Sequence, residues 1–174
     1  STSDGSSDVP VIAVLIDDQA VARFGPLPWP RDRLAELISQ LNTAGARGFA
    51  IDLIFAEQST AESDRSLAAA MASTPRVLAA AFDRDGRWLL PIERLGGVAV
   101  AAHAYGEVGP DGVVRTVAAT KQGQGLSLPA LSLAAARILR PDLMIEAGAE
   151  LRPQFRPSPQ VLPRISAADV LDRS

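Results

Sequence analysis

The feature that most constrains this fold is a set of three short, largely apolar runs. Between them lie segments whose apolar residues recur at the spacing of a helix. The runs are residues 9–16, 49–55 and 76–82, and each is bounded by polar residues. Continuous apolar runs of this length are typical of strands buried on both faces of a parallel sheet. Because helical segments lie between them, the β-α-β-α-β order predicts parallel strands joined by right-handed crossovers.

The segments between these runs have the signals of helices. One apolar stripe, at spacing i, i+3, i+4 and i+7, is formed by Leu34, Leu37, Ile38 and Leu41. Pro30 suits the first turn of that helix, and Gly45 suits the left-handed cap that ends it. In the second segment, Ser63 is expected to cap a helix that carries Leu67 and Met71 on one side.

After the third run the pattern changes to short strands and turns. A short strand is expected at 88–92, and strands at 97–108 and 113–120 flank a strong turn at 109–112. A further helix is expected at 128–139. The expected fold class is therefore α/β, a three-layer or two-layer sandwich with a mainly parallel central sheet and an antiparallel edge hairpin.

The two ends of the chain differ in composition from the middle. Residues 1–8 are small and polar and are interpreted as a linker or juxtamembrane spacer, which leaves residues 9–174 as one domain. Four prolines between 153 and 163 predict an extended, irregular segment. Ser166 then opens a capping box for a short helix over Ala167–Leu171, and we expect the domain to continue past residue 174.

Composition excludes several classes of function. The net charge of −3 and the single lysine, Lys121, give no basic surface for nucleic acid. The chain has no cysteine and one histidine, His103, which excludes thiolate sites and two-histidine metal sites built from this chain alone. No glycine-rich phosphate loop is present, so neither a metal nor a cofactor is expected.

Acidic residues at the first two runs suggest a ligand site. Asp17 and Asp18 follow the first run, and Asp52 lies in the second. Ligands of open α/β sheets bind outside the carboxyl ends of the strands, where these carboxylates are expected to lie. We expect them to cluster with Trp29 and Arg31 of the proline-rich loop. Arg31 would pair with one of the carboxylates, because an unpaired buried charge costs several kcal/mol.

Structural roles are the alternative for the same residues. Asp17 can cap the segment that follows it, and Asp52 can bond to a neighbouring loop. Trp29, held between two prolines, can fill the core instead of lining a pocket. His103 lies in an apolar strand, where a histidine is either structural or pocket-lining, and it completes the candidate ligand-binding set.

Two enzyme classes with strand-end aspartates fit this sequence poorly. A response-regulator receiver has two helices and a strand between its acidic pair and its phosphorylated aspartate, whereas one helix is expected between Asp18 and Asp52. A haloacid-dehalogenase-type phosphatase needs two aspartates separated by one residue. Asp17 and Asp18 are adjacent, so their side chains leave an extended strand in opposite directions. No catalytic residue is therefore assigned.

Five blocks along the chain carry a family resemblance. They are residues 11–18 with Gly25 and 28–31, residues 44–46 with 51–55, Asp64 with Leu67 and Ala70, residues 110–115, and Pro163 with 165–171. In order and spacing, these blocks resemble CHASE2 domains over nearly the whole chain. Two positions depart from the family pattern. Ala20 stands where a serine is frequent, and Leu27 stands where a second tryptophan is frequent.

The resemblance implies an extracytoplasmic sensor domain of a bacterial membrane-embedded signalling protein, facing the periplasm or the cell surface. Transmembrane helices and a cytoplasmic histidine kinase, nucleotide cyclase or serine/threonine kinase typically follow such a domain. Its expected partner is an unidentified small-molecule or protein ligand, and the domain itself is not expected to be an enzyme. The alternatives are a metal-dependent hydrolase or phosphotransfer domain using Asp17, Asp18 and Asp52, and a structural dimerisation module.

Self-association is a further expectation for the full-length receptor, because the outputs of such receptors usually work as dimers. The alanine-rich helices at 66–72 and 131–138 are the candidate surfaces, since small side chains allow close approach of a partner. The same small side chains also suit ordinary packing of a helix on a sheet.

Overall fold

The computed structural model describes residues 11–146, 148–152 and 162–173. The chain divides into two compact units: a terminal unit, Ser1–Trp29 with Arg156–Ser174, and a central unit, Pro30–Phe155. The sequence predictions for residues 1–8 and for most of 153–163 lie outside the described residues. The expected α/β class is confirmed, because parallel strands and helices alternate and antiparallel hairpins accompany them.

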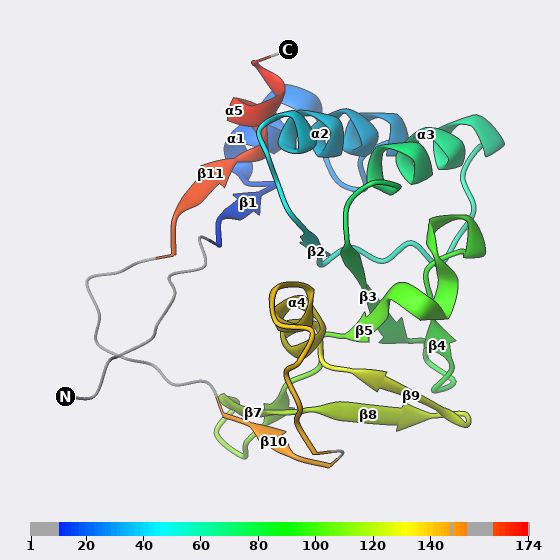
Figure 1. The fold of residues 1–174 in the computed structure, drawn as a ribbon, viewed down its shortest axis with the longest axis vertical. Helices are drawn as coiled ribbons and strands as arrows, with labels where there is room; N and C mark the ends of the chain where they lie inside the picture. The colour runs from blue at the N-terminus through cyan, green and yellow to red at the C-terminus, as the bar shows by residue number, and fades with distance from the viewer. Residues whose placement is uncertain (1–10, 147, 153–161, 174) are drawn as a thin grey trace. The chain divides into compact units, whose positions relative to one another are not determined.

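The terminal unit consists of two parallel strands, each followed at once by a short helix. Strand β1 (Ala13–Leu15) pairs with β11 (Arg164–Ser166), and helices α1 (Asp18–Phe24) and α5 (Ala167–Leu171) follow them (Figure 1). The bounds of α5 and its N-cap agree with the sequence prediction.

Two features of the terminal unit differ from expectation. The segment after Asp17, to which no helix or strand was assigned from the sequence, forms α1, which ends at Gly25 with a φ of 92° that glycine adopts readily. Strand β1 is shorter than predicted and is not buried on both faces, since Leu15 is 40% exposed. Among the described residues of its unit β1 pairs with β11 alone, and the exposure of Leu15 shows that burial on both faces was the wrong expectation.

The central unit is built on a parallel sheet of order β2-β3-β5. Its strands are β2 (Phe49–Ile51), β3 (Arg76–Phe82) and β5 (Ala101–His103), and β4 (Trp88–Leu89) pairs antiparallel with the end of β3. Strand β3 has the predicted bounds. Its middle residues 77–80 are at most 4% exposed, as expected for a strand with a neighbour on each side and packing on both faces.

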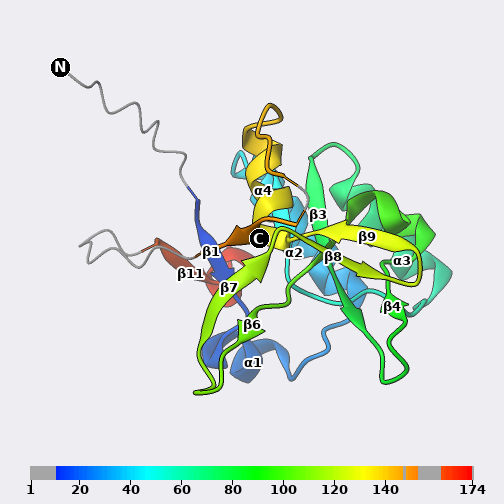
Figure 2. The ribbon, with the colours of Figure 1, turned by 90° about the horizontal axis from the view of Figure 1, so that it is seen from below.

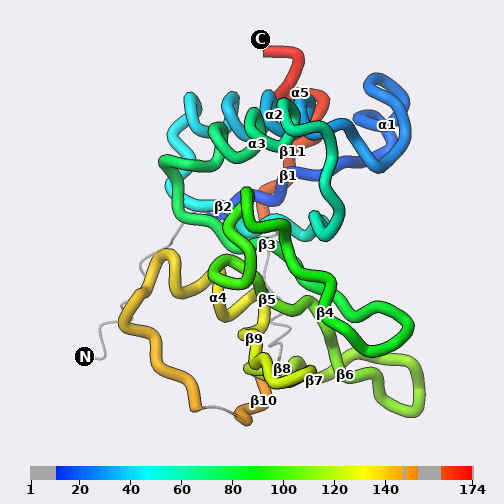
Figure 3. The backbone as a smooth tube through the Cα atoms, turned by 90° about the vertical axis from the view of Figure 1, so that its right-hand side faces the viewer, coloured from blue at the N-terminus to red at the C-terminus, as the bar shows by residue number. Residues whose placement is uncertain are grey.

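Helices cover both faces of this sheet. They are α2 (Arg31–Thr43), α3 (Ala61–Met71) and α4 (Leu131–Leu139). Helices α2 and α3 lie side by side on one face and α4 lies on the other, which makes the central unit a three-layer sandwich (Figures 1 and 3). Gly45, with a φ of 91°, ends α2 as predicted. The N-cap of α3 is Thr60 and not Ser63, because the helix begins two residues before Ser63.

Short strands complete the central unit. Strands β6 (Glu107–Val108), β7 (Val114–Ala118) and β10 (Glu150–Leu151) form an antiparallel sheet, and β8 (Thr120–Gly123) and β9 (Leu126–Pro129) form a hairpin (Figure 2). The predicted turn at 109–112 therefore joins a real hairpin, β6–β7. The hairpin β8–β9 was not predicted, and its strand β9 occupies the first residues of the helix expected at 128–139.

The segment expected as one strand at 97–108 instead contains a 3-10 helix at 97–100 and the two short strands β5 and β6. Gly96 and Gly97 adopt φ values of 120° and 54°, and the short 3-10 helices η1 (Glu93–Leu95) and η2 (Gly97–Val100) precede β5. Consecutive left-handed glycines cannot continue an extended strand, so the apolar character of this segment was a misleading signal.

Candidate functional site

Asp17 lies where β1 passes into α1 and acts as the N-cap of that helix. Its Oδ1 accepts the backbone N–H of Ala20 at 3.0 Å and the hydroxyl of Ser166 at 2.7 Å. The Ser166 hydrogen bond, followed by the Ala20 N–H, lowers the pKa of Asp17 below its usual value. Ser166 in turn caps α5 by accepting the Ala168 N–H at 3.2 Å. One pair of side chains thus fixes the starts of both helices.

The rest of the terminal unit supports this pairing. Gln19 donates to Asp169 at 2.9 Å, and Arg23 forms an ion pair with Asp172 at 2.7 Å, so α1 and α5 are linked along their lengths. Asp18, in the first turn of α1, is exposed, and its carboxylate makes no hydrogen bond or ion pair with another described residue.

Trp29 is a core residue of the kind that the structural alternative anticipated. Its side chain is 4% exposed, and its indole Nε1–H donates to the carbonyl of Gly25 at 2.8 Å. The ring also meets Phe24 edge-on, with centroids 6.0 Å apart. A buried tryptophan with its polar atom satisfied stabilises the loop that contains it.

Arg31 opens α2 in the central unit and forms a buried ion pair with Asp64 of α3. The two side chains are 11% and 4% exposed. The guanidinium group also donates to the carbonyl of Glu57 and lies over the ring of Phe55, 5.5 Å from its centroid. The Asp64 carboxylate accepts the backbone N–H of Ser59 at 3.2 Å. The pair thereby holds the loop after β2 against the starts of α2 and α3.

The expected partner of Arg31 was one of Asp17, Asp18 and Asp52, and the ion pair that the structure gives is instead with Asp64. Asp52 follows β2 directly and is exposed, and its carboxylate makes no hydrogen bond or ion pair with another described residue. The reason is geometric, because the start of α3 brings Asp64 to the guanidinium group. A cluster that joins Asp17, Asp18 and Trp29 to residues of the central unit stays a prediction.

His103, at the end of β5, is fully buried. Its Nε2 lies 3.0 Å from the carbonyl oxygen of Ala118, and its Nδ1 lies 3.3 Å from the backbone N of Tyr105. Burial is the main cause that lowers the pKa of His103 below the usual imidazole value. The imidazole is therefore enclosed and hydrogen-bonded at both nitrogens, and it is not a wall of an open pocket.

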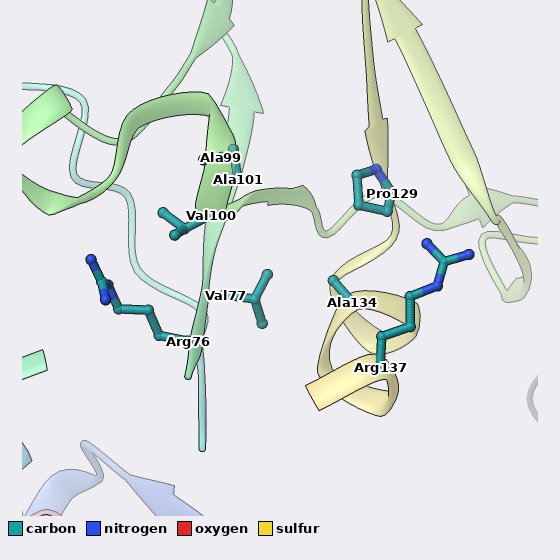
Figure 4. Close-up of a pocket in the computed structure, with 8 residues that line it drawn as sticks. All are labelled: Arg76, Val77, Ala99, Val100, Ala101, Pro129, Ala134 and Arg137. Carbon is teal, nitrogen blue, oxygen red and sulfur yellow. The ribbon is translucent and has the colours of Figure 1, made fainter. Parts of the chain in front are cut away.

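A hollow of about 200 Å³ lies between the parallel sheet and α4 (Figure 4). It is lined by Arg76, Val77, Ala99, Val100, Ala101, Pro129, Ala134 and Arg137. Its two arginines lie on opposite sides and point away from each other, and both donate to backbone carbonyls. Since β3 and β5 begin here, the hollow lies at the amino ends of the strands. Ligands of open α/β sheets bind at the other ends.

Sequence reasoning missed the two partners that organise these residues. Asp64 and Ser166 both lie in the blocks that carry the family resemblance. In the sequence, the feature that could have indicated their structural roles is a polar side chain beside apolar positions. Neither pairing follows from spacing, since Arg31 and Asp64 are 33 residues apart and Asp17 and Ser166 are 149 apart.

Removing the carboxylate of Asp64 tests the structural role of the buried pair. Asp64→Asn leaves the Arg31 charge without a counter-ion, so we expect it to lower the free energy of unfolding by about 3–5 kcal/mol. Urea denaturation measures the change. Asp52→Asn is the matched control, and as an exposed substitution it is expected to change stability by no more than about 0.5 kcal/mol. Equal effects of the two substitutions would contradict the assigned role of Asp64.

Ser166→Ala tests the link between the two strand ends. We expect a loss of about 1 kcal/mol at pH 7 from the missing N-cap. A carboxylate whose folded pKa is lowered stabilises the fold above its unfolded pKa, and this contribution disappears as the pH falls through the folded pKa. The loss caused by Ser166→Ala should therefore be smaller at pH 3 than at pH 7. Ser66→Ala, on the exposed side of α3, serves as control, and an equal loss at both pH values would contradict the link.

Within the described residues, no helix combines the length and apolar character needed to cross a bilayer. No curated protein and no solved structure matches the chain. The family model of the CHASE2 domain matches residues 1–173. The chain therefore belongs to the CHASE2 family of extracytoplasmic sensor domains of signalling proteins.

Proposed function

We propose that this chain is the ligand- or partner-sensing input domain of a bacterial transmembrane receptor and has no catalytic activity of its own. The observation that carries the proposal is the family match over residues 1–173. The output that we propose is a cytoplasmic histidine kinase, nucleotide cyclase or serine/threonine kinase, with the receptor acting as a homodimer.

The contacts of Asp17 and Arg31 count against a catalytic role for these two residues. Asp17 is occupied as a helix cap, and Arg31 is occupied by Asp64 and a backbone carbonyl. A nucleophile or general base needs free access to its substrate, whereas these groups are held by the fold.

Asp18 and Asp52 are the members of the candidate set whose carboxylates are exposed and unengaged by other described residues. We propose that each of these carboxylates, Asp18 in the terminal unit and Asp52 in the central unit, is separately available for a ligand contact, which favours cationic or hydrogen-bond-donating groups. Trp29, Arg31 and Asp17 then act as supports of the segments that present them.

The location of the domain is testable because the sequence contains no cysteine. In a full-length receptor made cysteine-free elsewhere, Asp52→Cys should react with a membrane-impermeant maleimide in intact cells, because Asp52 is exposed. Ala102→Cys, at a fully buried position, is the matched control and should react only after denaturation. Labelling of Asp52→Cys only after the cells are permeabilised would place the domain in the cytoplasm and contradict the proposal.

A further inference from the structure

The two hydrogen-bond partners of His103 fix its protonation state. A carbonyl oxygen can only accept, so Nε2 must carry the hydrogen that is shared with Ala118. A backbone N–H can only donate, so Nδ1 must offer a lone pair to Tyr105. Together these partners specify the neutral imidazole with its hydrogen on Nε2.

A second proton on His103 conflicts with this arrangement. It would add to Nδ1, where it would point at the N–H of Tyr105, so two donors would face each other and the bond would be lost. The imidazolium charge would also lie on a side chain that is 0% exposed. The folded geometry is therefore built for one of the two protonation states.

The charged neighbours of His103 come from several elements. Lys121 of β8 lowers the pKa of the imidazole and Glu107 of β6 raises it, after burial and the Ala118 carbonyl. The other ionisable residues on packed elements are Arg76 of β3, Arg137 of α4 and Arg115 of β7. Arg76 and Arg137 donate to backbone carbonyls, and Arg115 pairs with Asp111. Strand β9 contributes none.

Tyr105 connects His103 to the end of the sheet. Its backbone N–H binds the imidazole, its hydroxyl accepts the N–H of Phe82, and the ammonium of Lys121 lies 5.3 Å from the centre of its ring. Phe82 ends β3 and stacks on Trp88 with ring centroids 3.9 Å apart. A displacement of Tyr105 therefore reaches the carboxyl end of β3 and the aromatic stack.

His103 holds together separate parts of the central unit. Its backbone pairs with Ala80 of β3 and forms a parallel bridge with Ala130 before α4. Its imidazole is hydrogen-bonded to the carbonyl of Ala118 at the end of β7. The imidazole thus joins the parallel sheet to the β6–β7 hairpin region, and weakening its contacts affects both.

We propose that His103 is an acid-sensing switch, neutral and locked to Tyr105 at neutral pH and released from Tyr105 when the surroundings become acidic. The role of this release in signalling rests on the proposed extracytoplasmic location, where the domain meets the pH of the environment. The release itself is a property of the chain and does not depend on that location.

The free energy of unfolding should change with the protonation of His103. Because burial lowers the pKa of His103 in the folded state, the unfolded chain binds this proton more tightly. The contribution of the neutral imidazole to the free energy of unfolding is fully present above the unfolded pKa of about 6.5. It is lost as the pH falls from there towards the folded pKa.

A nuclear magnetic resonance titration of the purified chain tests the switch without ligand or membrane. His103 is the only histidine, so one imidazole signal reports its protonation. We expect a midpoint below the usual imidazole value, with the Tyr105 amide and the Trp88 indole changing in the same step. The Trp29 indole, bonded to Gly25 in the terminal unit, is the internal control and should not follow. Protonation of His103 without change at Tyr105 would overturn the proposal.

Two variants separate this switch from other pH effects. His103→Gln keeps an N–H donor for Ala118 but cannot titrate, so the step at Trp88 should disappear, and its persistence would refute the switch. Lys121→Met keeps His103 and removes a neighbouring positive charge, so the midpoint of the His103 titration should move to higher pH. An unchanged midpoint would contradict the placement of Lys121 beside the imidazole. Neither variant tests receptor location, so failure here is distinguishable from failure of the proposed function.

Discussion

The buried ion pair of Arg31 and Asp64 is the interaction on which the central unit most depends. Each charge would be costly alone in a site where the two side chains are 11% and 4% exposed. Paired, and with hydrogen bonds to the Glu57 carbonyl and from the Ser59 N–H, they hold the loop after β2 against the first turns of α2 and α3. Breaking the pair would leave one charge buried without its counter-ion.

The terminal unit uses the same principle with a different pair. Asp17 and Ser166 are side by side because β1 and β11 run parallel, and each caps the helix that follows its strand. A carboxylate and a hydroxyl satisfy backbone N–H groups that the first turn of a helix leaves open. In both units, a side chain that resembled part of a reactive site in the sequence is held near a helix start by a partner far away in the chain.

The sequence predicted the elements that depend on local signals. The bounds of β3, the glycine that ends α2 and the serine that opens α5 were all correct, because periodicity and capping act within a few residues. Prediction from the sequence failed where contacts between distant parts of the chain determine the structure. Helix α1 was missed because the proline-rich segment after it suggested a loop. The partner of Arg31 depends on the placement of α3, which no local pattern specifies.

The candidate site was predicted less well than the fold. Residue types indicated polar groups at strand ends, but whether a carboxylate faces solvent or a helix start depends on tertiary packing. Asp52 and Asp18 are exposed, whereas Asp17 is engaged, although all three have the same chemistry and similar positions in the sequence. His103 was expected to be either structural or pocket-lining, and it is an enclosed imidazole with a hydrogen bond at each nitrogen.

A double-mutant cycle tests most sharply whether Arg31 and Asp64 act as one structural unit. The unfolding free energies of the wild type, Arg31→Met, Asp64→Leu and the double variant give the coupling energy between the two side chains. We expect a coupling energy towards the upper end of the range of about 0.5–3 kcal/mol found for residues in contact, with the double variant more stable than the sum of the single losses implies. Additivity within about 0.5 kcal/mol, as found for independent sites, would contradict it.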